Sequence, residues 1–150
     1  MASFILVSIV AGLLGAAAME AVMFLITRAQ WARCNMVTAL GGLISRHREN
    51  AFKVGAAVHG LAAVGFALLY NYAMRAFGIA AFPNAFFAGV GFGFIHGLFV
   101  SLTLVWVVSD NHPFEEYRET GFAVGVVHLA GHIVYGAVVG LVIAAGTAFH

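Results

Sequence analysis

The sequence has few charged residues, and this scarcity excludes most classes of protein. Only 9% of its 150 residues are charged and 63% are apolar, against about 25% and about 45–50% in a typical soluble domain. Its seven Lys and Arg nearly balance its six Asp and Glu, so no basic surface for nucleic acid is expected. The composition therefore argues against a soluble enzyme or a nucleic-acid-binding protein and indicates an integral membrane protein.

Cysteine and proline are scarce as well. The single cysteine, Cys34, excludes an internal disulfide and a thiolate metal cluster. There are only two prolines but eighteen glycines. Because small residues let helix backbones approach closely in lipid, this composition indicates closely packed membrane helices.

Four stretches of the chain are long and apolar enough to cross a bilayer, which takes about 20 residues of helix. They are residues 4–27, 52–73, 85–108 and 121–147. We therefore predict an all-α integral membrane protein with one domain, residues 1–150, built as an up-down-up-down bundle of four transmembrane helices. Residues 36–44 are also apolar and favour a short helix at the membrane interface.

The orientation follows from the basic residues near the ends of these spans. Those on one side are Arg28, Arg33, Arg46, Arg48, Lys53 and Arg118, and the other side has only Arg75. Since cytoplasmic loops carry the excess of Lys and Arg, we expect the two larger loops, 28–51 and 109–120, in the cytoplasm. Both termini are then expected on the non-cytoplasmic side.

Five ionisable residues lie within the predicted spans, and every span contributes at least one. They are Glu20, His59, His96, His128 and His132. A charged side chain at the centre of a spanning helix costs about 2.5–3.5 kcal/mol, so such residues usually face the interior of a bundle. All five fall in the cytoplasmic half of their spans, in two layers about 6–7 Å apart at 1.5 Å per residue.

The helical spacing also places these residues on inward faces. His128 and His132 are four residues apart and so share one face. His96 lies on the same stripe as Gly89 and Gly93, and small residues mark a packed face. The Glu and the four histidines are therefore expected to converge.

Such a cluster predicts a transition-metal site, because imidazole and carboxylate are ligands for iron, copper and zinc. On this hypothesis at least three of Glu20, His59, His96, His128 and His132 bind one centre, and the protein carries out redox or oxidase-type chemistry there. No individual residue is assigned a catalytic role.

Two alternatives remain open. His96 and His132 lie at matching depth on neighbouring antiparallel helices and could bind haem b or serve a quinone site in an electron-transfer protein. In the other alternative, the chain is a non-catalytic subunit of a larger membrane complex, and its histidines only satisfy hydrogen bonds. The expected partners are the lipid bilayer and either further copies of the chain or such a complex, with no nucleic acid.

The polar loop 110–116 is interpreted as an ordinary solvated turn, with Pro113 opening a short helix. The run Arg46, His47, Arg48 is interpreted as an anchor to anionic lipid headgroups.

Overall fold

A computed structural model describes residues 2–31, 35–103, 106, 108–118 and 121–148. Cys34 and Arg33 lie outside these ranges. The described elements are α1 (Ala2–Arg28), α2 (Met36–Ser45), α3 (Arg48–Ala76), α4 (Asn84–Thr103), α5 (Ser109–Asn111), the 3-10 helix η2 (Glu115–Tyr117) and α6 (Phe122–Ala148). No strand occurs in this part of the chain, so the prediction of an all-helical protein is confirmed.

The four predicted spans correspond to α1, α3, α4 and α6, each long and apolar enough to cross a membrane. The short helix expected at residues 36–44 is present as α2. Helix α3 begins at Arg48 and not at residue 52, because a helix can continue into polar sequence beyond its apolar stretch. Glu49 in its first turn favours this extension, since a carboxylate stabilises the positive end of the helix dipole.

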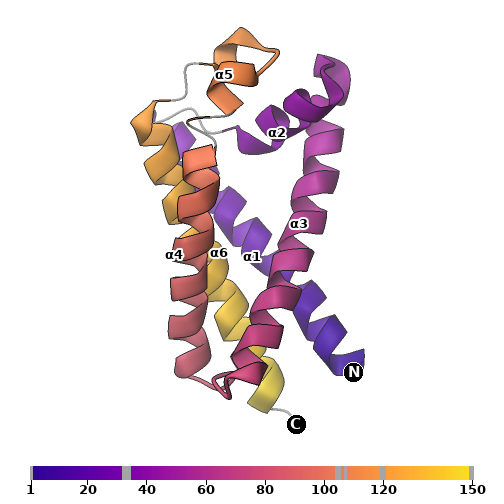
Figure 1. Cartoon of the computed structure of the whole chain (residues 1–150), viewed down its shortest axis with the longest axis vertical. Helices are drawn as coiled ribbons and strands as arrows, with labels where there is room; N and C mark the ends of the chain where they lie inside the picture. Colours follow the sequence, from indigo (N-terminus) through magenta and orange to yellow (C-terminus); the bar gives the residue numbers. More distant parts are fainter. Residues whose placement is uncertain (1, 32–34, 104–105, 107, 119–120, 149–150) are drawn as a thin grey trace.

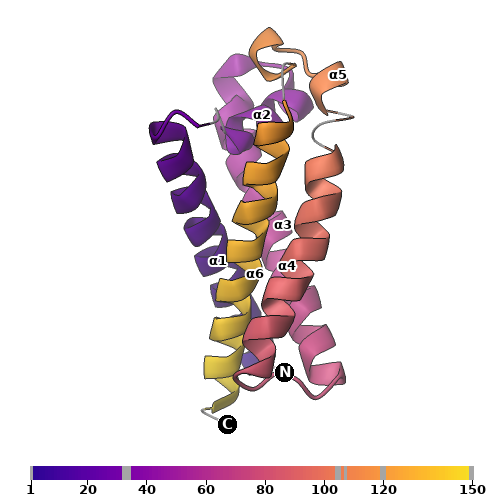
Figure 2. The same cartoon turned by 90° about the vertical axis from the view of Figure 1, so that its left-hand side faces the viewer.

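The long helices lie side by side along the long axis of the molecule (Figure 1). Both chain ends lie at one end of this axis, and α2 and α5 lie at the other (Figures 1 and 2). Helix α6 packs along α4 and α1, while α3 packs against α1 and α2. Because α3 and α4 have few contacts with each other, space for a cavity is left between them.

Glycine makes the close contact of α4 with α6 possible. A Cβ atom on Gly89 would collide with the carbonyl oxygen of Gly136, and one on Gly93 would collide with that of His132. In the same way, a Cβ atom on Gly140 would collide with the carbonyl oxygen of Ala85. The two backbones are in direct contact, so the glycine stripe predicted from the sequence packs within the chain.

This contact predicts a position-dependent effect of alanine on α4. Gly89→Ala should lower the free energy of unfolding in detergent by about 1–3 kcal/mol, because the new methyl group overpacks the interface. Gly91→Ala is the matched control, since nothing lies within 4 Å of its Cβ position. Chemical denaturation followed by circular dichroism measures both, and equal stability of the two variants would contradict the prediction.

Candidate functional site

The site is a cavity of about 690 Å³ between α3, α4 and α6. Its wall is mostly apolar and includes Phe66, Ile95 and Phe99. Met19 of α1 and Met36 and Leu40 of α2 also line it. Four of the five predicted site residues reach this wall: His59, His96, His128 and His132.

The two histidines of α6 bind the backbone of their own helix. Nδ1 of His128 lies 2.7 Å from the carbonyl oxygen of Val124, and Nδ1 of His132 lies 2.8 Å from that of His128. A carbonyl oxygen can only accept, so Nδ1 carries the proton in both rings, and the lone pair of the neutral imidazole is on Nε2. Nε2 of His128 is buried and has no hydrogen-bond partner.

His96 faces His132 from α4. Its Nδ1 lies 3.2 Å from the hydroxyl oxygen of Tyr70, and its ring stacks on Phe66 with 3.7 Å between the ring centroids. The His96 and His132 rings meet edge to face, with their centroids 4.7 Å apart. These two residues are therefore brought together, as the sequence predicts, and they contact each other directly.

Glu20 and His59 form a pair between α1 and α3. Oε1 of Glu20 lies 3.5 Å from Nε2 of His59, which is too long for a well-formed hydrogen bond. Both atoms are buried without a hydrogen-bond partner. Since buried polar atoms are nearly always paired, the pair and Nε2 of His128 leave three buried atoms that a ligand or water could satisfy.

The five predicted ligands share one region without forming a ligand shell. Within the described ranges, no group of three or more His, Cys, Asp or Glu side chains is arranged to hold a metal ion. The contacts among these side chains join them only in pairs, His96 with His132 and Glu20 with His59. The residues meet in twos around a cavity.

Tyr135 and Tyr70 are the tyrosines next to the histidines, and they are not among the site residues predicted from the sequence. The Tyr135 hydroxyl donates to the carbonyl oxygen of Ala63 at 2.6 Å, which joins α6 to α3 across the cavity wall. Tyr70 is 4% exposed and contacts Tyr135 edge to face. Tyr135 lies one helical turn after His132, which is a signal that the sequence does contain, whereas Tyr70 lies 11 residues from His59 and has no such signal.

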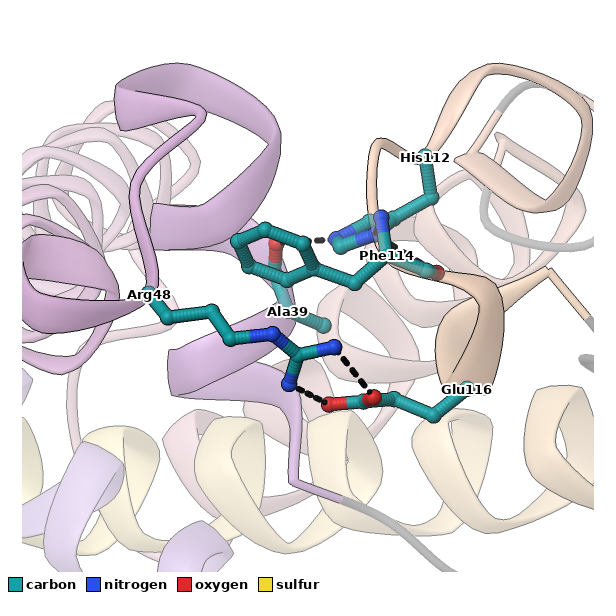
Figure 3. Close-up of polar contacts among 5 residues, drawn as sticks. All are labelled: Ala39, Arg48, His112, Phe114 and Glu116. Carbon is teal, nitrogen blue, oxygen red and sulfur yellow. Dashed lines mark hydrogen bonds and ion pairs between the residues drawn. The ribbon is translucent and has the colours of Figure 1, made fainter.

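The loop interpreted as a solvated turn packs against α2 instead (Figure 3). His112 is 1% exposed, and its Nε2 donates to the carbonyl oxygen of Ala39 at 2.8 Å. Its Nδ1 accepts from the backbone N–H of Phe114 at 3.0 Å. The solvated-turn interpretation is therefore wrong for His112 and Phe114, because both side chains are covered by α2, which the sequence does not place beside them.

Arg48 reinforces this contact from the start of α3. Its guanidinium forms a bidentate ion pair with Glu116, in which both N–O distances are 2.7 Å (Figure 3). The guanidinium carbon also lies 4.5 Å from the centre of the Phe114 ring. The hydrogen bonds from Arg48 lower the pKa of the Glu116 carboxyl below its ordinary value. Arg48 thus bonds to protein in this structure, where the sequence suggested lipid headgroups.

Comparison with protein-family models, with curated proteins and with solved structures gave no match to this chain.

The ion pair predicts a pH-dependent contribution of Glu116 to stability. Because the pKa of Glu116 is lower in the folded state, its contribution is present at neutral pH and is lost as the pH falls through that pKa. The melting temperature of Glu116→Gln should be slightly below that of the parent at about pH 7, with no difference at about pH 3. Glu115→Gln, at the exposed neighbouring position, is the control, and a Glu116→Gln deficit that persists in acid would contradict the prediction.

Proposed function

We propose that the chain is a multi-pass membrane protein that binds haem b in its cavity and transfers electrons through it. In this proposal α1, α3, α4 and α6 cross the bilayer up-down-up-down, with both termini on the non-cytoplasmic side. The four helices that could span a membrane and the six-to-one distribution of basic residues support this arrangement.

The arrangement of His128 and His132 is the observation that carries the proposal. A histidine that binds a metal through one ring nitrogen almost always donates the other ring N–H to a carbonyl or carboxylate, which fixes its orientation. Both α6 rings donate Nδ1–H to a carbonyl, which leaves the Nε2 lone pair to act as a ligand. Both also line an apolar cavity.

Haem fits this arrangement better than a bare metal ion does. A bare ion takes most of its ligands from protein side chains, and the described residues hold no group of three. Haem iron needs only one or two axial protein ligands, and the macrocycle is apolar. The cavity volume of about 690 Å³ lies within the range of about 300–1,000 Å³ usual for sites of small molecules and cofactors.

His132 on α6 would hold the haem iron, and His96 on α4 would be its second ligand. Since these rings contact each other at 4.7 Å between centroids, they must part before both can bind one iron. Ligation by His132 alone needs no such separation. When bound, the iron supplies a one-electron redox centre, and this chain's own part is to ligate it, orient it and exclude water.

A transition metal ion remains a second candidate, because three buried ligand atoms have no hydrogen-bond partner. They are Oε1 of Glu20, Nε2 of His59 and Nε2 of His128. An ion or a water could satisfy them. Elemental analysis and a visible spectrum of purified protein together distinguish the two candidates, since haem gives iron with a Soret band and a bare ion gives metal without such a band.

The test is haem binding by the purified protein and by His132→Ala. Titration with haemin should give the parent a Soret band shifted from that of free haemin, and His132→Ala should bind at least about tenfold more weakly, because a ligand to iron is lost. His47→Ala is the control, since His47 is exposed and lies outside the cavity. Equal haem affinity in the parent and both variants would eliminate the site.

The proposed orientation has its own test at the end of α6. In a Cys34→Ser background, Ala148→Cys should react with a membrane-impermeant maleimide added on the non-cytoplasmic side of sealed vesicles. Reaction only with reagent on the cytoplasmic side would overturn the orientation, without affecting the haem proposal.

A further inference from the structure

Helix α2 forms one end of the cavity. Figure 1 shows it near the end of the molecule opposite both termini, between the ends of α3 and α6. Its residues Met36 and Leu40 belong to the cavity wall. The helix therefore lies between the cavity and the outside at the end where the sequence predicts the cytoplasm.

One side of α2 is packed directly onto the backbone of α3. A Cβ atom on Gly41 would collide with the carbonyl oxygen of Ala51, and a Cβ atom on Gly55 would collide with that of Val37. Helices α2 and α3 consequently form a rigid hairpin.

The other side of α2 is held by the connection between α4 and α6. The Phe114 ring lies against Gly42, where a Cβ atom would come within 2.6 Å of it. His112 bonds to Ala39 of α2, and Glu116 pairs with Arg48 at the start of α3. We call His112, Phe114 and Glu116 the latch, and Figure 3 shows all three reaching toward the α2–α3 hairpin.

The latch joins the two sides of the cavity at this end. One side is the α2–α3 hairpin, and the other is α4 with α6. Helices α3 and α4 have few contacts with each other. Release of the latch would therefore let the end of the α2–α3 hairpin and the loop separate, and the separation would open a way past Leu40 into the cavity.

We propose that α2 is a latched gate, which closes the cytoplasmic end of the cavity to water and to polar ligands. The gate opens when the contacts that His112, Phe114 and Glu116 make with the α2–α3 hairpin break. A ligand with charged groups cannot readily pass through the hydrocarbon core to reach the cavity sideways. At the cytoplasmic end, such a ligand can enter the cavity while its charged groups stay in water. The gate concerns the cavity itself, so the proposal goes beyond haem binding and holds for any occupant.

The three contacts of the latch differ in strength. Both side chains of the Arg48–Glu116 pair are about half exposed, at 61% and 49%, and pairs of this kind contribute little. His112 and Phe114 are buried, at 1% and 9% exposed, and they provide a hydrogen bond and an apolar contact. Loss of Phe114 should therefore open the gate more than loss of the ion pair.

The test is the accessibility of a thiol placed inside the cavity. Val100 of α4 lines the cavity, so Val100→Cys in a Cys34→Ser background reports on the gate. The haem-free protein is reconstituted in vesicles with a charged maleimide on both faces, so that neither haem binding nor orientation affects the result. Adding Phe114→Ala should raise the labelling rate at least tenfold, and adding Glu115→Gln should leave it unchanged.

A second variant tests the gate without the large change in packing that could misfold Phe114→Ala. Glu116→Gln removes only the exposed ion pair and should raise the labelling rate by a smaller factor, about twofold to fivefold for a contribution below 1 kcal/mol. Unchanged labelling in both variants would overturn the gate. Rapid labelling of the parent protein would overturn it as well, because the cavity would then be open with the latch intact.

Discussion

The direct backbone contact of α4 with α6 is the constraint on which the site depends. Glycine at positions 89, 93 and 140 lets the backbones of these helices touch at three points. The same contact determines where His132 lies, because a Cβ atom on Gly97 would come within 2.6 Å of the His132 Cβ atom. The imidazole therefore occupies space that only glycine leaves open, and its ring meets that of His96.

The cavity lies where two of the long helices, α3 and α4, are not closely packed. Helix α6 is bound to α4 on one side and to α1 on the other, and α3 is held by α1 and α2. Among the described residues, α3 and α4 have few contacts with each other, and aromatic and histidine side chains surround a space there. Apolar walls that include histidine side chains suit a flat apolar cofactor that carries a metal ion.

The sequence predicted the elements well, and it predicted the gathering of the ionisable residues in part. Hydropathy located the four long helices and α2, and helical spacing placed four histidines on one cavity. The sequence could not predict that Nδ1 of His128 bonds to the carbonyl oxygen of Val124, because the side-chain rotamer decides which ring nitrogen faces the backbone. The burial of His112 was missed because it depends on Ala39, a residue 73 positions away, and local pattern contains no such information.

The glycine spacing on α4 leaves the register of the two helices open. Glycines recur every fourth residue at 89, 93 and 97, and α6 carries glycines at 136 and 140 followed by Ala144. Sliding α4 by one turn along α6 would again set small residues against small residues. His132 opposes the slide toward Ser101, since its side chain fits beside Gly97 and would face the larger Ser101 after that slide. The histidine that we propose as a ligand thus also blocks one of the shifted alignments of the helices that present it.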